Sequence, residues 1–286
     1  MSGMFMRFPK GRAKALTLSY DDGTEQDIRL IRIMNQNGLK GTFNLNSGRF
    51  APEGTVYPPE EFHRKLSVRQ VKEVYTDSGH EVAVHGLTHP FLEKLPESMA
   101  MWELLKDREN LENTFRTIVR GMAYPFGTCN DTVVECLKKA GLVYGRTTIS
   151  SHSFDIPADW FRLQATCHHN DPELMPLVRK FIEEMPAREP WMFYLWGHSF
   201  EFETGDNWEV IEEFAAFAGG HEDVWYATNI QIHDYVQAYW RLEFSVDGRQ
   251  VYNPTVTELF SKKTGRCTAF CRERRRTCKQ LFSDNF

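Results

Sequence analysis

The sequence predicts an α/β protein built on a closed or nearly closed barrel of parallel strands. Strand-like and helix-like segments alternate about seven times between residues 15 and 241, and this pattern calls for parallel strands with helices outside. An open, doubly wound sheet would favour a glycine-rich phosphate turn after the first strand. That strand instead ends in Asp21-Asp22-Gly23, whose negative charge is wrong for phosphate.

The order of elements follows from apolar runs and helix boundaries. The first strand is an apolar run that stops at two carboxylates, and Ser67 with Gln70 forms a capping-box pattern that opens a helix. The predicted strands are 15–20, 41–46, 81–85, 121–124, 143–147, 191–196 and 224–227. The predicted helices are 27–37, 67–79, 98–119, 131–141, 172–184, 207–217 and a last one ending near 241.

The character of the chain changes near residue 242. We expect residues 1–242 to form the barrel and 243–261 a hairpin appendage around Asp247-Gly248. Residues 262–286 are rich in Arg and Cys, and we expect a solvated, poorly ordered tail. Three cysteines without a later His lack a fourth ligand for structural zinc, and a basic arm on nucleic acid is the weaker alternative.

The composition limits the kinds of binding partner and the cellular location that we expect. The chain has 286 residues and a net charge of −5, which gives no general reason to expect nucleic acid or an anionic membrane as a partner. The N-terminal residues do not resemble a signal peptide, no stretch approaches a membrane span, and the six cysteines are read as reduced thiols. We therefore expect a cytoplasmic protein; its oligomeric state stays open.

Several predicted strands end in groups that can bind a metal. The first ends in Asp21 and Asp22, the third runs into His85 and His89, and the sixth into His198. In a parallel barrel these ends rim the same mouth. Two imidazoles and one carboxylate make a three-ligand site for Zn²⁺ or a similar ion, with a position open for water. Each piece alone also has an ordinary explanation, as a turn or a packed core histidine.

Five stretches in order resemble the successive motifs of the polysaccharide deacetylase family, carbohydrate esterase family 4. They are Ser19-Tyr-Asp-Asp-Gly23, His85-Gly-Leu-Thr-His89, Tyr124-Pro-Phe-Gly127, Asp159-Trp160 and Leu195-Trp-Gly-His198. The resemblance covers about residues 13 to 240. It implies a deformed (β/α)7 barrel that removes acetyl groups from N-acetylated or O-acetylated sugars with one metal ion, usually Zn²⁺, with Co²⁺ or Ni²⁺ as alternatives.

The resemblance also implies a role for each matching residue. Asp22, His85 and His89 would be metal ligands, Asp21 the general base that acts on a metal-activated water, and His198 the general acid. The substrate contacts that it implies are the backbone N–H of Phe126 for the oxyanion, the side chains of Trp160 and Leu195 around the acetyl methyl group, and Trp196, which could equally serve packing.

One departure from the family pattern concerns the base. The third motif usually begins with an Arg that orients the base, often together with the Asp of the fourth motif, and this position is Ala123 here. Asp159 is present without that partner, and Arg120 or Arg162 could move in. A base with no cation beside it should have a less depressed pKa. Tyr20 and Gly86 also differ from the common residues but keep every ligand.

A further polar cluster, Cys167-His168-His169-Asn-Asp171, follows the fourth motif. It could be a second metal site, although groove-lining or structural polar residues explain it better.

We therefore expect a metal-dependent hydrolase acting on the acetyl C–N or ester bond of a sugar or oligosaccharide. Two alternatives are a hydrolase of a small cytoplasmic amide and a non-catalytic sugar-binding relative, the latter because the usual Arg is missing.

Overall fold

The main sheet is a path of parallel strands that surrounds the interior of the protein. The computed structural model describes residues 4–263 and 266–270. The path runs β7-β6-β5-β4-β3-β2-β9-β8, and β10 pairs with β2 beside it. The strands are β2 (Lys14–Asp21), β3 (Gly41–Leu45), β4 (Glu81–Val84), β5 (Gly121–Ala123), β6 (Tyr144–Ser150), β7 (Leu163–Ala165), β8 (Cys167–His168), β9 (Trp191–His198) and β10 (Val224–Tyr226).

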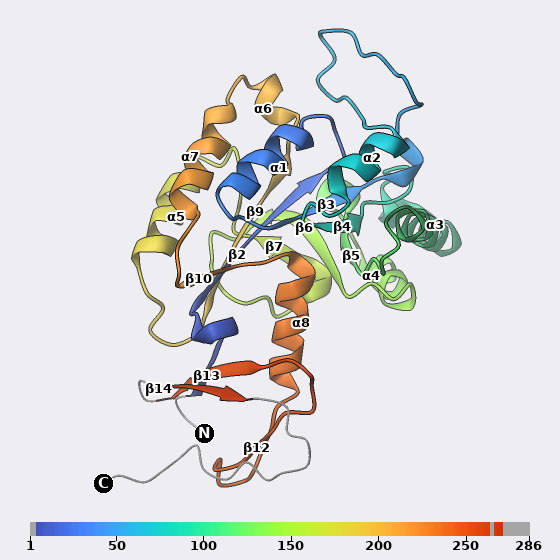
Figure 1. Ribbon diagram of the computed structural model, residues 1–286. Helices are drawn as coiled ribbons and strands as arrows, with labels where there is room; N and C mark the ends of the chain where they lie inside the picture. Colours follow the sequence, from blue (N-terminus) through green and yellow to red (C-terminus); the bar gives the residue numbers. More distant parts are fainter. Residues whose placement is uncertain (1–3, 264–265, 271–286) are drawn as a thin grey trace.

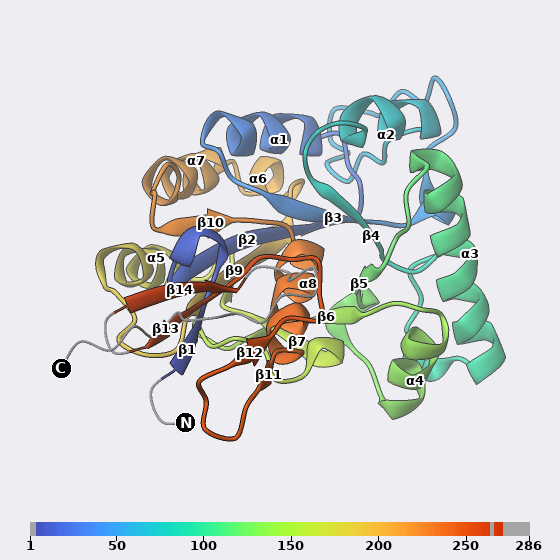
Figure 2. The same cartoon turned by 60° about the horizontal axis from the view of Figure 1, so that its bottom comes forward.

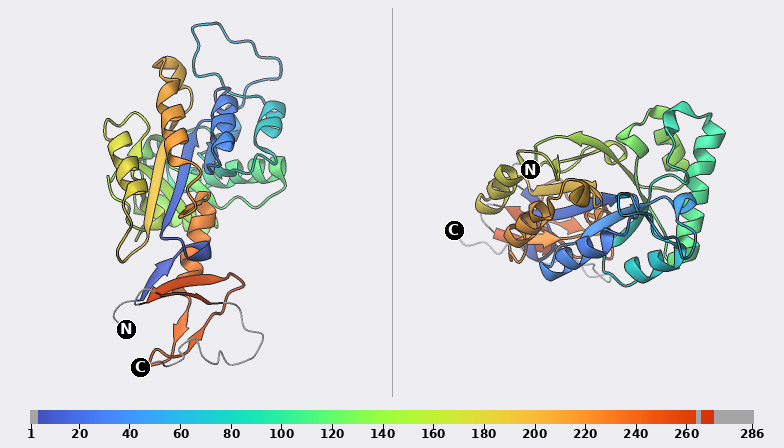
Figure 3. Two further views of the ribbon diagram at one scale, coloured as in Figure 1. Left: turned by 60° about the vertical axis from the view of Figure 1, so that its left-hand side comes forward. Right: turned by 90° about the horizontal axis from the view of Figure 1, so that it is seen from above.

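The two ends of this path are neighbours in the chain, because Thr166 alone separates β7 from β8. β7 pairs with β6, β8 pairs with β9, and the N–H of Thr166 donates to the carbonyl of Tyr194 at 2.8 Å. Counted as one strand, β7 and β8 complete a ring of seven parallel strands (Figure 3, right). The α/β fold with a deformed (β/α)7 barrel is confirmed.

One member of the ring differs from the prediction. Residues 224–227 were expected as the seventh barrel strand, but β10 pairs with Lys14, Ala15 and Leu16 at the start of β2, where β3 does not reach. Residues 163–168 take that place in the ring instead. This segment is two short pieces on either side of Thr166, too short to show a clear strand pattern in the sequence.

Helices cover the outside of the ring (Figures 1 and 2). They are α1 (Asp27–Gln36), α2 (Val68–Tyr75), α3 (Glu97–Phe115), α4 (Asp131–Lys139), α5 (Leu174–Glu183), α6 (Glu201–Thr204), α7 (Trp208–Ala218) and α8 (Asn229–Trp240). Short 3-10 turns lie at Pro9–Gly11, Ser47–Arg49, Leu92–Lys94, Pro125–Gly127 and Trp160–Arg162. The predicted capping box at Ser67 and Gln70 is present at the start of α2.

The two faces of β2 separate packing from chemistry. Leu16, Leu18 and Tyr20 lie in the large core between strands and helices. Because side chains alternate along a strand, Thr17, Ser19 and Asp21 face the inside of the ring, and all three are fully buried or nearly so. The interior is therefore polar, and it leads to the carboxyl ends of the strands.

A small antiparallel sheet lies at the opposite end of the ring from the long loop between the turn Ser47–Arg49 and α2 (Figure 1). It consists of β1 (Met4–Arg7), β13 (Leu259–Lys263) and β14 (Arg266–Phe270), next to the hairpin of β11 (Glu243–Phe244) and β12 (Val251–Tyr252). The predicted turn at Asp247-Gly248 therefore joins two strands.

The expected boundaries at this end need two corrections. Residues 262–263 and 266–270 form strand rather than a poorly ordered tail, because Leu259 and Phe270 are buried in a second apolar cluster with Met6 and Phe8. Residues 4–7, assigned to the barrel, pair with this sheet. Residues 271–286 lie outside the described part. Among the described residues, we find no helix with the length and apolarity needed to span a bilayer.

Candidate active site

The ends of β2 and β9 bring the expected acid and base together. Asp21 ends β2, His198 ends β9, and the two are register partners in the sheet. The Nε2 atoms of His198 and His85 lie 3.9 and 3.7 Å from the same Oδ2 atom of Asp21. The structure thus joins three of the predicted site residues at one mouth.

Asp22, His85 and His89 also converge. One ligand atom from each lies within 4.8 Å of the others. The Nδ1 atom of His85 lies 2.7 Å from the carbonyl of Ala123, so it carries the hydrogen, and Nε2 is left buried without a hydrogen-bond partner. A free lone pair on Nε2 is what a metal ligand requires. Burial also lowers the pKa of His85, and it lowers that of His89 to about 4, so both rings stay neutral. The residues fit a divalent metal.

Three residues of this region hold left-handed backbone conformations. Asp22 has φ +85°, His89 +60° and Phe126 +59°. Such conformations are costly for residues other than glycine and gather at functional sites, where the surrounding structure maintains them. Their clustering around one mouth supports the assignment of the candidate site to this end of the ring.

Two acidic residues of α3 hold the loop that carries both histidines. Oδ2 of Asp107 accepts the backbone N–H of His85 at 3.1 Å. Glu103 accepts the backbone N–H and the hydroxyl of Thr88 at 2.8 and 2.7 Å. Both acids are buried. Their contribution was missed in the sequence, although a spacing of four residues on one helix face is a usable signal.

The long loop before α2 supplies two more contacts to Asp22. Nζ of Lys65 donates to Oδ1 of Asp22 at 2.9 Å, and Nε2 of His63 lies 3.0 Å from Oδ2. Burial alone would raise the pKa of Asp22, but His63 and Lys65 outweigh it and hold this pKa well below its usual range. The carboxylate is therefore ionised, as a ligand must be.

Arg146 provides the cation that the motif comparison left missing. It lies on β6 with no exposed surface, and its guanidinium binds both carboxylate oxygens of Asp21. Burial would raise the pKa of Asp21, but Arg146, with His85 and His198, holds it below its ordinary value. The expectation of an unpaired base with a less depressed pKa was wrong. A charged residue inside a predicted buried strand was the available signal.

The other candidate cations are engaged elsewhere. Arg120 pairs with Asp234 at 2.7 Å. Arg162 pairs with Asp159 at 3.1 Å and also with Asp131. Asp159 is therefore turned to a surface ion pair rather than to the base.

A second polar cluster surrounds Glu201, which begins α6 three residues after His198. Oε1 of Glu201 lies 3.2 Å from Nδ1 of His198, and Oε2 lies 3.1 and 3.0 Å from Nε2 of His168 and His169. Burial would raise the pKa of Glu201, but the three imidazoles lower it far below its usual range. Burial alone would lower the pKa of His198, but Glu201 and Asp21 raise it above its ordinary value.

A metal ion could be shared by His168, His198 and Glu201, judged by the distances between them. The tautomer of His168 is unfavourable for such a site. Nδ1 of His168 accepts the backbone N–H of Asn170 at 3.1 Å, so in a neutral ring Nε2 carries the hydrogen and has no lone pair to give. His85 has the opposite arrangement. The prediction that the cluster around His168 is structural or lines a groove fits this geometry better than a second metal site.

The four predicted substrate contacts separate into two pairs. Phe126 is about half exposed and its ring lies edge-on to His89, with 4.6 Å between centroids. Trp196 faces the inside of the ring, where the Arg146 guanidinium lies 4.6 Å from its centroid. These two residues border the mouth.

Leu195 and Trp160 do not lie where the acetyl pocket was expected. Leu195 is fully buried in the core between strands and helices, because it alternates with Trp196 along β9. Trp160 is buried against α8, with its ring edge-on to His233 at 5.0 Å between centroids.

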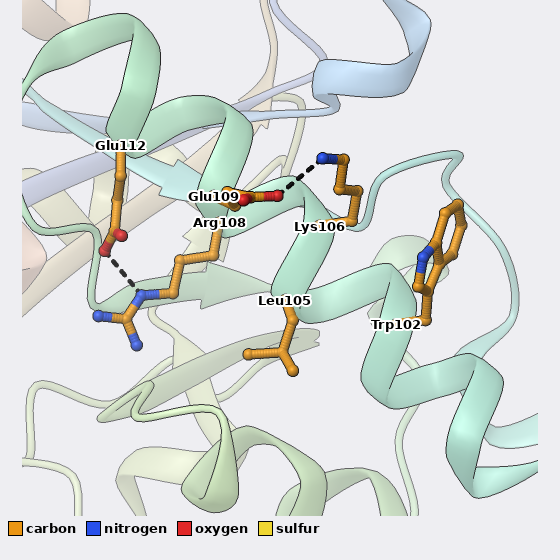
Figure 4. Close-up of a pocket in the computed structure, with 6 residues that line it drawn as sticks. All are labelled: Trp102, Leu105, Lys106, Arg108, Glu109 and Glu112. Carbon is orange, nitrogen blue, oxygen red and sulfur yellow. Dashed lines mark hydrogen bonds and ion pairs between the residues drawn. The ribbon is translucent and has the colours of Figure 1, made fainter.

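A surface hollow on α3 is separate from this mouth (Figure 4). It is lined by Trp102, Leu105, Lys106, Arg108, Glu109 and Glu112. Its charged side chains are paired with each other, Lys106 with Glu109 and Arg108 with Glu112. It contains none of the predicted catalytic residues.

Known structures match the fold. A Mycobacterium smegmatis structure described as a candidate polysaccharide deacetylase superimposes with a TM-score of 0.55 at 17% identity, covering 82% of this chain and 93% of that one. The Xyl-CE4 domain of a multidomain xylanase, from the hindgut metagenome of Trinervitermes trinervoides, gives 0.51 at 15% identity, covering 79% and 92%.

Sequence comparison finds relatives that match part of the chain. The chain is 30% identical over 169 residues to the poly-beta-1,6-N-acetyl-D-glucosamine N-deacetylase of Staphylococcus aureus, which covers 53% of this chain and 54% of that protein. The chain thus spans about half the length of this relative. The sequence profile of polysaccharide deacetylases matches residues 9–145. Over these residues the chain is similar to the polysaccharide deacetylase family.

Proposed function

We propose that the protein removes an acetyl group from an N-acetylated or O-acetylated carbohydrate in a metal-dependent hydrolysis. One observation carries the proposal: a metal-ligand triad of Asp22, His85 and His89 lies beside an ionised carboxylate, Asp21, and a histidine, His198, at one mouth. A base and an acid on either side of a Lewis acid is the arrangement that acyl hydrolysis requires. The S. aureus relative, named for N-deacetylation of a glucosamine polymer, supports a sugar substrate.

Asp22, His85 and His89 would hold the metal, with Zn²⁺ favoured because two imidazoles and a carboxylate are a common zinc ligand set, and Co²⁺ or Ni²⁺ as alternatives. When bound, the ion would polarise the acetyl carbonyl and acidify a water molecule. Lys65 and His63 would keep the Asp22 carboxylate ionised and fixed in place.

Asp21 would act as the general base. Arg146 and the side-chain amide of Asn44, which donates to Oδ1 at 2.8 Å, hold the carboxylate in a fixed orientation. Its Oδ2 atom faces His85 and His198, where an attacking water would be placed. Asp21 would take the proton of this water as the new C–O bond forms.

His198 would act as the general acid. As the C–N or C–O bond to the sugar breaks, the proton on Nε2 would pass to the departing nitrogen or oxygen. The products are acetate and the free amine or hydroxyl. The backbone N–H of Phe126 would stabilise the oxyanion, and Trp196 would form one wall of the pocket. Trp160 and Leu195 no longer belong to the proposed pocket, given their burial elsewhere.

The experiment is an acetate-release assay on β-1,6-linked N-acetylglucosamine oligomers and on acetylated xylan, with and without a chelator. Asp22→Asn should abolish acetate release, whereas the matched surface variant Asp131→Asn should retain it. Release that survives both chelation and Asp22→Asn would contradict the proposal. Release from small cyclic amides but from neither carbohydrate would favour the alternative substrate class.

The proposed catalytic unit is the barrel with its helices, from β2 to α8. The hairpin of β11 and β12 and the sheet of β1, β13 and β14 are appendages. The proposed partner is the acetylated oligosaccharide. A cytoplasmic location stays a prediction.

A further inference from the structure

The carboxylate nearest to the proposed acid was not among the predicted site residues. Glu201 follows His198 by three residues, and its Oε1 atom lies 3.2 Å from Nδ1 of that ring. Asp159, the acidic residue that the motif comparison had placed at the site, instead pairs with Arg162 and is about half exposed. The site therefore draws a carboxylate from α6 rather than from the turn before β7.

We propose that Glu201 is the positioning residue of His198, fixing its tautomer and ring orientation so that Nε2 delivers the proton to the leaving group. This inference rests on the proposed function, in which His198 is the acid. No atom of Glu201 has to touch the substrate.

The tautomer follows from the contacts. An ionised carboxylate only accepts hydrogen bonds, so Nδ1 of His198 must carry a hydrogen toward Glu201. Nε2 is then the nitrogen that gains and loses the transferable proton, and it points toward Asp21, 3.9 Å away. A histidine whose Nδ1–H is held by a carboxylate is the arrangement that keeps imidazole in the productive tautomer in acyl hydrolases.

Two further imidazole rings lie close to the other carboxylate oxygen of Glu201. Its Oε2 atom lies 3.1 Å from Nε2 of His168 and 3.0 Å from Nε2 of His169. His169 is 1% exposed and stacks on Phe202, with 4.2 Å between centroids. Neither contact has hydrogen-bond geometry, since Oε2 of Glu201 and Nε2 of His169 have no hydrogen-bond partner. The two rings limit the space around the carboxylate, and its directed contact is the one with His198.

The charged groups around His198 are few. Asp21 faces it from β2, Glu201 from α6, His168 from β8 and His169 from the turn after β8, and Asp22 adds a more distant negative charge. Removing the charge of Glu201 leaves Asp21 and Asp22 as the nearby anions. The protonated form of His198 would then be less stable, and the acid would lose its proton at a lower pH.

The test compares Glu201→Gln, Glu201→Asp and the matched control Asp159→Asn in the full chain. We expect Glu201→Gln to lower kcat roughly 10- to 100-fold with little change in KM, and to move the alkaline limb of the pH profile down by about one pH unit. Glu201→Asp keeps the charge and should recover part of kcat and the position of the limb. Asp159→Asn should match the wild type.

A second readout does not depend on activity. NMR titration of the ¹⁵N-labelled His198 ring should show the Nδ1–H tautomer in the wild type and a lower pKa in Glu201→Gln, while Asp159→Asn leaves both unchanged. An unchanged tautomer and pKa in Glu201→Gln would overturn the inference, as would a fall in activity with an unmoved pH profile. If the wild type releases no acetate, the proposed function fails, and the NMR titration still decides whether Glu201 positions His198.

Discussion

Arg146 and Asp21 form a buried ion pair across the inside of the ring, although 125 residues separate them in the chain. The guanidinium comes from β6, contacts both oxygens of the carboxylate at the end of β2, and lies over the ring of Trp196. One nitrogen of the guanidinium, Nη2, donates to both carboxylate oxygens of Asp21. The pair therefore neutralises the buried charge of Asp21 and restricts the orientation of this carboxylate.

Arg146→Met should be severely destabilising, because it leaves the Asp21 charge buried without its partner. We expect a loss of about 3–5 kcal/mol in the free energy of unfolding, measured by urea denaturation at pH 7. Arg120→Met is the matched control, since its pair with Asp234 is partly exposed and should contribute at most about 1 kcal/mol. Equal effects of the two substitutions would show that the buried pair does not stabilise the fold.

Removal of the metal should lower the thermal stability of the protein without unfolding it. The apo protein prepared with a chelator should show a lower Tm, and Zn²⁺ should restore it, because a ligand that binds only the folded state stabilises that state. His85→Ala removes the free Nε2 atom, so metal analysis should find less than one ion per chain, and added Zn²⁺ should no longer raise the Tm. His80→Ala, a histidine outside the triad, should keep the response; its loss would point to a general folding defect.

The pH dependence of acetate release should be bell-shaped. The lowered pKa of Asp21 places the acid limb below the ordinary carboxyl range of about 4, since the base must be ionised. The raised pKa of His198 places the alkaline limb above about 6.5, since the acid must be protonated. Asn44→Ala removes one donor to Asp21 and should move the acid limb upward, leaving the alkaline limb in place. If Asn44→Ala moved only the alkaline limb, that limb would belong to Asp21 and the acid limb to His198.

Asp27 should make stability depend on pH. Burial raises its pKa to about 7, against the hydrogen bond from Tyr75. Because the folded state holds this proton more tightly than the unfolded chain, the contribution is complete below about pH 4 and is lost as pH rises through about 7. Asp27→Asn cannot lose a proton, so its stability relative to the wild type should rise by roughly 2–4 kcal/mol between pH 4 and pH 8. Thermal unfolding at both values measures it.

Asp107, whose pKa is also raised by burial to about 7, contributes to the same pH window. It is present in the wild type and in Asp27→Asn, so the difference between these proteins isolates Asp27. Asp234→Asn is the control, because its carboxyl pKa is lowered and should not titrate between pH 5 and 8. A parallel pH response of wild type and Asp27→Asn would show that Asp27 is ionised in the folded state.

The meeting of Asp21, His85 and His198 at one mouth was predictable because each of these residues stands at or directly after the end of a strand. Residues at the carboxyl ends of parallel strands meet at one mouth whatever their separation in sequence, so Asp21, His85 and His198 could be grouped without knowledge of the packing. Arg146 could not be matched to Asp21 in this way. It lies within a strand, and its reach across the ring depends on the diameter of the barrel and on which neighbours fill it.

Glu201 and Leu195 show two different reasons why a site residue is misplaced when only the sequence is known. Glu201 was visible three residues after His198, but its role depends on the chain turning into α6 at that point, which the strand pattern did not indicate. Leu195 was placed at the site because it neighbours His198 in the motif. The alternation of side chains along β9 sends it to the opposite face.

The ring closes at Thr166. Here the N–H and the hydroxyl of this residue bond to the two backbone groups of Tyr194, next to the pairing of β8 with β9. His168, whose Nε2 atom lies 3.1 Å from Glu201, stands only two residues further on. The segment that shuts the barrel wall therefore also carries an imidazole beside the carboxylate proposed to position His198.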